Sequence, residues 1–252
     1  SAFAAGSGVN WDGVIGGFLV YPSGVLDENL FAHEFVHSLQ AQAANDKLLK
    51  CPTVGFSAFH IWESQANYLR SVLYPDMCTP FGVDFYHSLA PEPHWSSAYQ
   101  GEVIFYAIEA DGGVQRASEA WLNNCEGQTI FDTYRVQSQK TQAQLSDFVW
   151  RNYAAASVGL DFERNGSFLR TYRNGYVNQD IKMRMRMWDI VSPIDTLLQR
   201  YKIPSELAPE DHAFNLVRII PKDRTAPIQL EFKGRPEVNS HAGWRYGWVT
   251  LG

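Results

Sequence analysis

The residues with the clearest chemical potential are His33, Glu34 and His37, which form an HExxH motif in the run HEFVH at positions 33–37. Residues i and i+4 lie on the same face of an α-helix, so the two imidazoles can reach one metal ion. Glu34 then points beside the ion, where it can accept a proton from a bound water. The motif therefore predicts a zinc site with a general base next to it.

A catalytic zinc site needs a third protein ligand and one open position for water or substrate. The HExxHxxGxxH branch of these motifs supplies a third His, but the corresponding position here is Ala43, which excludes that branch. A glutamate on a following helix is the alternative, and Glu63 fits it. Glu63 follows Ile61 and Trp62 in a largely apolar segment, and a carboxylate in apolar surroundings needs a partner.

Two predicted helices position these residues. Asp27 can cap a helix that runs from about 28 to about 43, and a second helix is expected from about 58 to 73. The apolar run 18–21, bounded by glycines and a proline turn, predicts a short strand before the first helix. Residues 1–13 are small and glycine-rich and are expected to form a loop or a frayed arm. The first helix has apolar residues at helical spacing, namely Leu30, Phe31, Phe35, Val36 and Leu39.

The rest of the chain divides into a helical part and a strand-rich part. Three further helices are expected, at 98–110 before Gly112-Gly113, at 114–123, and at 142–156 behind Thr141. Four strand-like runs follow, at 182–188, 214–220, 228–232 and 244–251, and the first of them is also compatible with a helix. These patterns predict an α+β fold, with a helix-rich zincin-like catalytic domain over 1–212 and a C-terminal β-strand segment over 213–252.

The strand and the two helices, with HEFVHSLQ followed by WESQANYLR, resemble the gluzincins, the HExxH metallopeptidases with a downstream glutamate ligand. They also resemble a largely uncharacterised group of secreted gluzincin-like proteins whose motif is HEFxHxxQ followed by WExxAN. The segments 203–215 and 244–247 resemble that group as well, so the likeness covers most of the chain. Its specific motifs lie in the first 75 residues.

The resemblance implies a set of roles for individual residues. His33, His37 and Glu63 would bind zinc, and Glu34 would take a proton from the zinc-bound water and pass it to the leaving amine. In many gluzincins a residue one turn after the glutamate ligand hydrogen-bonds a ligating His, which points to Asn67. The segment 18–21 is similar to the edge strand along which gluzincins bind an extended peptide.

A peptidase also needs a donor that stabilises the oxyanion. The sequence offers three candidates, His94, Tyr99 and Tyr153, and core packing is the better interpretation for each tyrosine.

The three cysteines leave the pairing open. Cys51 and Cys78 could pair across a short segment with Cys125 free, and three buried thiols are an equally good interpretation. No signal peptide pattern is present, so any secretion signal would lie outside this sequence. Lysine is scarce relative to arginine and aromatic residues are plentiful, which suits the extracellular location that the resemblance implies.

Composition excludes several other classes of protein. The chain has 252 residues, 45% of them hydrophobic, and no apolar run long enough for a membrane span. It carries 27 acidic and 21 basic residues, a formal charge of −6, and no basic stripe, which disfavours nucleic-acid binding. The expected partner is a peptide, protein or glycoprotein substrate, and the oligomeric state does not follow from the sequence.

The sequence thus predicts a secreted zinc metalloprotease, a hydrolase that cleaves peptide bonds within a chain by means of a zinc-activated water. Two alternatives remain open. One is a catalytically inactive gluzincin-like binding module for carbohydrate or a protein partner, with the aromatic C-terminal segment as the contact surface. The other is a zinc hydrolase that acts on a non-peptide amide, because HExxH is not confined to peptidases.

Overall fold

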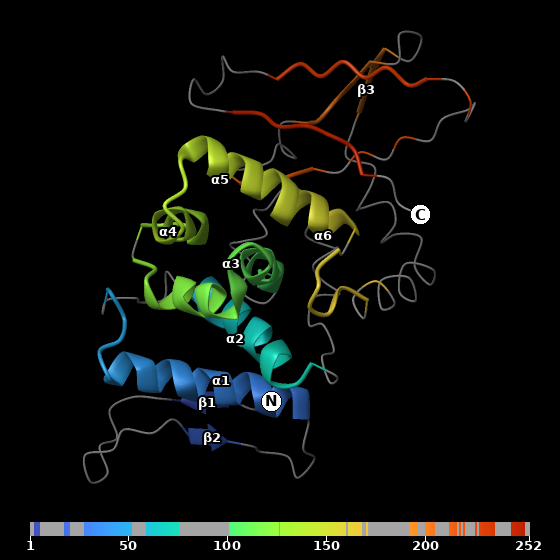
Figure 1. Ribbon diagram of the computed structural model, residues 1–252. Helices are drawn as coiled ribbons and strands as arrows, with labels where there is room; N and C mark the ends of the chain where they lie inside the picture. The colour runs from blue at the N-terminus through green and yellow to red at the C-terminus, as the bar shows by residue number, and fades with distance from the viewer. Residues whose placement is uncertain are drawn as a thin grey trace.

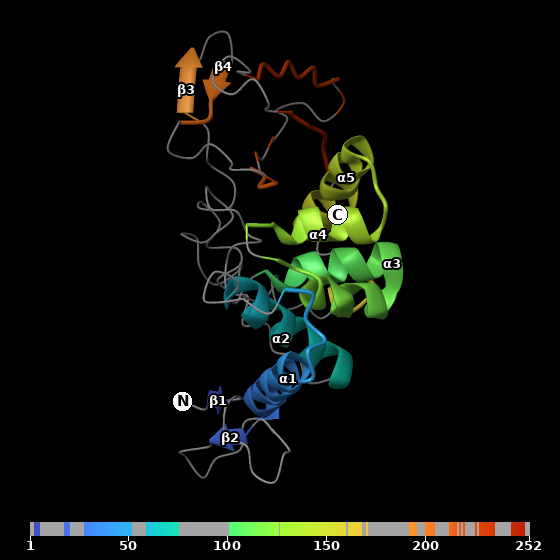
Figure 2. The same ribbon diagram turned by 90° about the vertical axis from the view of Figure 1, so that its left-hand side faces the viewer.

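The computed structural model shows a helix-rich protein with little strand, in which the helices stack from the α1 end to the α5 end (Figures 1 and 2). The residues that the structure describes are 3–5, 18–20, 28–51, 59–75, 101–125, 127–159, 161–167, 170, 192–195, 200–204, 212–215, 217, 219, 225, 227–234 and 243–249. None of the helices within these ranges is long and apolar enough to cross a membrane.

Two short strands lie beside α1 at one end of the molecule (Figure 1). Strand β1 (Phe3–Ala5) pairs antiparallel with β2 (Phe18–Val20), with Phe3 opposite Val20. The strand expected at 18–21 is confirmed at Phe18–Val20. The expectation of a loop throughout 1–13 is wrong, because pairing with β2 supplies the backbone hydrogen bonds that the local composition did not suggest.

The two helices expected to carry the metal ligands are confirmed to within two residues. Helix α1 spans Glu28–Asn45, and Glu28 lies in its first turn, where a carboxylate complements the helix dipole. Helix α2 spans Phe59–Leu73 and packs against α1. Ile61 and Tyr68 of α2 are buried in the core that continues into α3.

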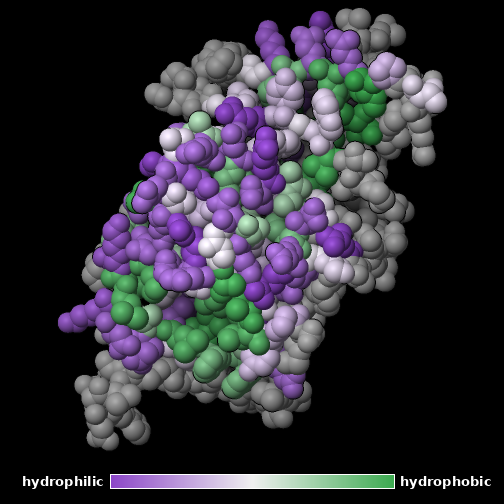
Figure 3. All heavy atoms as spheres, in the orientation of Figure 1, coloured by the Kyte–Doolittle hydropathy of each residue, from purple (hydrophilic) through white to green (hydrophobic). Residues whose placement is uncertain are grey.

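The buried face of α1 differs from the apolar face that its sequence suggests. Val36 is fully buried, but Phe31, Phe35 and Leu39 are 37%, 40% and 47% exposed. Apolar side chains gather at the α1 end of the surface in Figure 3. The side of α1 that faces α2 instead carries polar residues. This arrangement is expected when a helix contributes side chains to a polar site in addition to packing against the core.

Helix α3 (Glu102–Leu122) contains the break that its Gly112-Gly113 pair predicts. Gly113 has φ +82° and ψ 168°, a conformation outside the helical region that glycine adopts without a Cβ clash. The two helices expected at 98–110 and 114–123 therefore correspond to the two halves of α3, although the first begins at Glu102.

The third helical region begins with α4 (Ile130–Gln137), which the sequence analysis did not predict. Its N-cap Thr129 accepts a hydrogen bond from the Asp132 backbone, and the Asp132 side chain accepts one from the Thr129 backbone. This capping box was the sequence signal for α4. A similar box at Thr141 starts α5 (Gln142–Phe148), as expected.

The helix expected at 142–156 is confirmed, with a local change of helix type. Helix α5 continues into a π-helical segment, η4 (Val149–Ala155), and then into α6 (Ala156–Gly159). Helix α3 lies between α2 and the α5–η4 helix (Figure 1). Large buried side chains from these helices form the core, including Ile104, Phe105, Ile108, Phe131, Tyr134, Leu145, Phe148 and Tyr153.

The C-terminal part does not show the expected β-strand segment. Strands β3 (Ser192–Asp195) and β4 (Arg200–Lys202) form an antiparallel pair before it. Within the described residues after 212, no continuous strand is present. The segments 227–234 and 243–249 are held instead by ring contacts of Phe232 with Trp244 (5.9 Å) and Tyr246 (5.4 Å). The run 182–188 lies outside the described residues, and the domain boundary at 212/213 stays a prediction.

A disulfide joins Cys51, in the chain after α1, to Cys125, just beyond α3, with a Cα–Cα distance of 5.3 Å. The backbone hydrogen bond from Lys50 N to Leu122 O (2.9 Å) holds the same two segments together. Neither a Cys51–Cys78 pair nor three free thiols agrees with this arrangement. Sequence proximity favoured Cys78, whereas the return of α3 brings Cys125 to Cys51.

Removal of this disulfide should lower the free energy of unfolding. The cross-link has a sequence separation of 74, and constraint of a loop of that size contributes about 2–5 kcal/mol. A Cys125→Ser variant should lose about this amount in denaturant unfolding, while Cys78→Ser, the matched control, should not. Non-reducing peptide mapping that links Cys51 to Cys78 would contradict the pairing.

The buried Glu102 at the start of α3 should make the stability depend on pH. Burial raises the pKa of its carboxyl from 4.5 to about 7, although the Arg70 guanidinium acts in the opposite direction. Its contribution to stability is therefore full below pH 4.5 and is lost as the pH rises through about 7. This loss amounts to about 3 kcal/mol.

A Glu102→Gln variant should lack this loss, so its free energy of unfolding should fall less steeply between acid and neutral pH than that of the wild type. Denaturant unfolding at a series of pH values measures the slope. Glu119→Gln, on the same helix, serves as the control. Equal slopes for wild type and Glu102→Gln would show that the carboxyl does not titrate in this range.

Candidate metal centre

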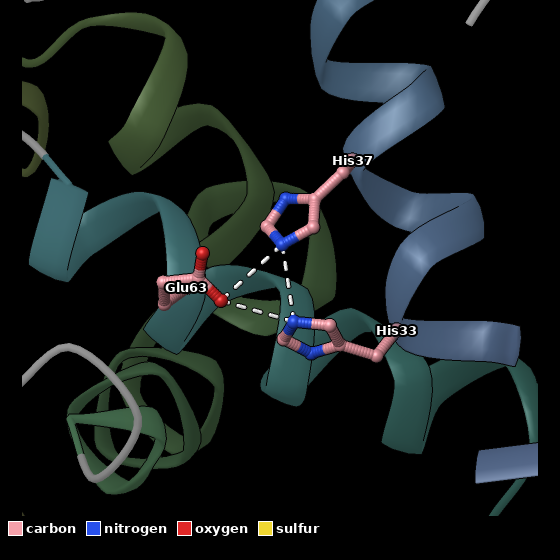
Figure 4. Close-up of side chains that lie close together, drawn as sticks. All are labelled: His33, His37 and Glu63. Atoms are coloured by element: carbon pink, nitrogen blue, oxygen red, sulfur yellow. Dashed lines mark hydrogen bonds and ion pairs between the residues drawn. The ribbon is translucent and has the colours of Figure 1, made fainter. Parts of the chain in front are cut away.

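Three side chains from two helices meet at one point between α1 and α2. His33 and His37 extend from α1 and Glu63 extends from α2 toward them (Figure 4). The Nε2 atoms of the two imidazoles are 3.0 Å apart. Oε2 of Glu63 lies 3.0 Å from Nε2 of His33 and 3.3 Å from Nε2 of His37. The cluster of His33, His37 and Glu63 could hold a metal ion.

The size of this triangle fits one small cation. In a tetrahedral site with metal–donor distances of about 2.0–2.1 Å, neighbouring donor atoms are roughly 3.3 Å apart. The three measured separations of 3.0, 3.0 and 3.3 Å match the edges of such a tetrahedron. The three side chains thus fit one face of a tetrahedral site, which leaves the fourth position for another ligand.

The centre is shielded from water by the packing of α1 on α2. His33 is 3% exposed and Glu63 is 8% exposed. The His37 side chain is the more accessible of the two imidazoles, with 12% exposed against 4% for His33. A carboxylate and two imidazoles buried in this way are costly unless a positive charge joins them.

Each imidazole has an amide oxygen at its other ring nitrogen. Nδ1 of His33 is 2.8 Å from Oδ1 of Asn67, which confirms the contact expected for Asn67. Nδ1 of His37 is 2.7 Å from Oε1 of Gln40, a contact that the sequence analysis did not assign. The available signal was the position of Gln40, three residues after His37 and hence on the same helix face. An amide oxygen can only accept, so each contact is a hydrogen bond when Nδ1 carries the proton, and in that tautomer the Nε2 atom presents a lone pair.

The electrostatics of the cluster follow from these contacts. Burial by itself would raise the pKa of the Glu63 carboxyl, but hydrogen bonds and charge interactions with His33 and His37 lower it to about 2. Burial would lower the pKa of the His37 imidazole, but its interactions with Glu63, Gln40 and Glu34 raise it. A proton on His37 therefore competes with a metal ion for the same lone pair, so metal binding should weaken in acid.

Glu34 lies next to the centre without being part of the donor triangle. It is 7% exposed on α1, and its charge contributes to the raised pKa of His37. Glu34 is thus a buried carboxylate within electrostatic reach of the cluster.

The three candidates for the oxyanion donor have different outcomes. His94 and Tyr99 lie outside the described residues. Tyr153 is fully buried in η4, where its ring packs against Phe131 (5.3 Å) and Phe214 (5.6 Å). This segment lies across α3 from α1 (Figure 1), and burial raises the pKa of the Tyr153 hydroxyl. Tyr153 is thus a core residue, not a member of the centre.

Loss of one ligand should abolish metal binding. The wild-type protein is expected to bind about one zinc per chain, and His37→Ala should bind none, because two remaining donors hold zinc weakly. Elemental analysis after dialysis measures the content. His212→Ala removes an imidazole that packs on Phe131 instead, and it should keep the zinc. Full retention by His37→Ala would contradict the ligand assignment.

Comparison with known proteins assigns the chain to a family but supplies no activity. Neither the curated proteins nor the solved structures contain a match to this sequence. The match to one family extends over residues 1–252, the full length of the sequence. The protein therefore belongs to DUF6055, a family of unknown function.

Proposed function

We propose that this protein is a zinc-dependent endopeptidase of the gluzincin type. The observation that carries the proposal is the convergence of three electron-pair donors, Nε2 of His33, Nε2 of His37 and Oε2 of Glu63, within 3.3 Å of one another. Two His and one Glu with an open fourth position form a ligand set found in catalytic zinc sites. Structural zinc sites, in contrast, have four protein ligands.

The donor atoms favour zinc over calcium and magnesium. Imidazole nitrogen and a single carboxylate oxygen suit zinc, whereas calcium and magnesium prefer an all-oxygen shell. Zinc bound at this centre would supply Lewis acidity and would lower the pKa of a coordinated water toward about 7.

Glu34 is the residue of this chain that we assign to proton transfer. It is buried beside the donor triangle but is not one of its three members. Its carboxylate would take a proton from the attacking water and later deliver it to the leaving amine. Asn67 and Gln40 hold the two imidazoles through their Nδ1 atoms, so that the Nε2 atoms stay directed at the centre.

Substrate binding and location complete the proposal. The expected edge strand is β2, which contacts α1 and pairs with β1. A peptide, protein or glycoprotein substrate would add to this sheet in an extended conformation. Secretion is supported by the Cys51–Cys125 disulfide, because such bonds persist in oxidising compartments.

A second candidate is a binding module without peptidase activity. Its support is the exposure of two aromatic side chains in the C-terminal segment, Tyr246 at 66% and Trp248 at 77%. Exposed aromatic rings of this size are suited to contact with a sugar or a protein surface. In this alternative the metal centre would serve only to hold α1 and α2 together.

Substitution of the proposed base separates these functions. Glu34→Gln should keep the zinc and lower the cleavage rate of an unfolded protein substrate by at least about 100-fold, because general acid–base catalysis contributes that much. Glu28→Gln, an exposed glutamate on the same helix, is the matched control.

Cleavage by the wild type should also stop when a chelator removes the zinc. Unchanged cleavage by Glu34→Gln would contradict the role of Glu34. Absence of chelator-sensitive cleavage across unfolded proteins and glycopeptides, with zinc bound, would favour the binding module.

A further inference from the structure

We propose that Gln40 and Gln65 form a relay that fixes the tautomer of His37 and ties the metal centre to α3. The relay consists of His37, Gln40, Gln65 and the backbone carbonyl of Ser118. It rests on the proposed function to the extent that His37 is a metal ligand. Gln40 and Gln65 are positioning residues in this proposal, because they act on the metal only through His37.

Two backbone carbonyls, which can only accept hydrogen bonds, determine how the side-chain amides of Gln40 and Gln65 are oriented. Nε2 of Gln65 donates to the carbonyl oxygen of Ser118 in α3 (2.9 Å). The amide oxygen of Gln65 must therefore face Gln40, whose Nε2 donates to it (2.9 Å). The same Nε2 of Gln40 donates to the carbonyl oxygen of Trp62 (3.1 Å).

Both protons of the Gln40 amide nitrogen are then in use, so its oxygen is the atom left for His37. That oxygen is 2.7 Å from Nδ1 of His37. Because it can only accept, the proton of a neutral His37 ring lies on Nδ1. Nε2 of His37 is then a lone-pair donor, which is the form that binds a metal.

Rotation of the Gln40 amide by half a turn would be costly. Its NH2 group would face Nδ1 of His37, and its oxygen would face the Trp62 carbonyl and the Gln65 oxygen. Gln40 is 2% exposed and Gln65 is 1% exposed, so water does not readily replace the lost hydrogen bonds. Each unsatisfied buried polar group costs about 1–3 kcal/mol, which is enough to hold one orientation.

The two imidazoles differ in what orients them. His33 is held by Asn67, which lies on the same helix as Glu63, so two helices define its position. The relay that holds His37 passes from α1 through α2 to the second half of α3, beyond the break at Gly113. His37 is also the more exposed of the two rings. Its orientation therefore depends more on a hydrogen-bond partner that is itself held in place.

Nitrogen NMR of the metal-free protein, at an alkaline pH where the ring is neutral, tests the relay directly. Histidine labelled with nitrogen-15 reports which ring nitrogen carries the proton. The wild-type His37 should have the Nδ1–H form, and Gln40→Met should shift it toward the Nε2–H form. Gln42→Met is the matched control, since the Gln42 amide donates to Asp46, just beyond the end of α1, and among the described residues it has no bond to the relay.

Zinc affinity, measured by competition with a chelator, is the second readout. Gln40→Met should weaken binding by about 10–100-fold, as is usual for loss of a group that orients a ligand. Gln65→Met should cause a smaller loss, because Gln40 keeps its bond to the Trp62 carbonyl, and Gln42→Met should cause none. A Gln40→Met protein that fails to fold leaves the wild-type tautomer and Gln65→Met to decide.

The outcomes separate this inference from the proposed function. An Nε2–H form in the wild type would overturn the relay, as would zinc affinities unchanged in both Gln40→Met and Gln65→Met. An Nδ1–H form in a wild-type protein that binds no zinc would support the relay while overturning the proposed function. Reduced affinity in the two relay variants and not in the control would support both.

Discussion

The close contact of two imidazole nitrogens and a carboxylate oxygen between α1 and α2 is the interaction on which the candidate site depends. With an amide oxygen at each Nδ1 atom, the imidazoles of His33 and His37 direct their Nε2 atoms at each other and at the Glu63 carboxylate. When both rings carry their proton on Nδ1, all three atoms present lone pairs, and a cation between them makes the contact favourable. A proton binds only one of the nitrogens, whereas a metal ion would bind all three donor atoms at once.

Other features of the fold can be understood as support for that contact. The polar face of α1 is turned inward, while Phe31, Phe35 and Leu39 remain partly exposed on the outside. The partial exposure of these apolar side chains lowers the hydrophobic stabilisation of the fold, which is not expected of a helix whose only role is to pack in the core. The break in α3 and the Cys51–Cys125 bond bring the end of α3 back toward the chain after α1. The centre is thus braced on the α3 side as well as by α2.

The sequence predicted what local pattern determines and missed what depends on distant contacts. Helices α1 and α2 and the pairing of His33 with His37 follow from spacing on a helix, which the sequence records directly. The prediction of Glu63 as the third candidate ligand came instead from its apolar surroundings and from the resemblance to the gluzincins. The partner of Cys51 and strand β1 depend on where the chain returns, and spacing contains no such information. The apolar runs after 212 have the pattern of strands, yet the described residues there pair through aromatic rings. The contact of Gln40 with His37 could have been predicted from its position on the helix. Its bonds to α2, and through Gln65 to α3, could be found only once the structure placed these helices.

The most direct test of the central claim is a crystallographic anomalous difference map from data collected on both sides of the zinc absorption edge. We predict one strong peak above the edge, within about 2.0–2.2 Å of Nε2 of His33, Nε2 of His37 and a carboxylate oxygen of Glu63. The peak should nearly vanish below the edge. A zinc-supplemented crystal with no peak between these three atoms, or with its peak elsewhere on the chain, would contradict the account.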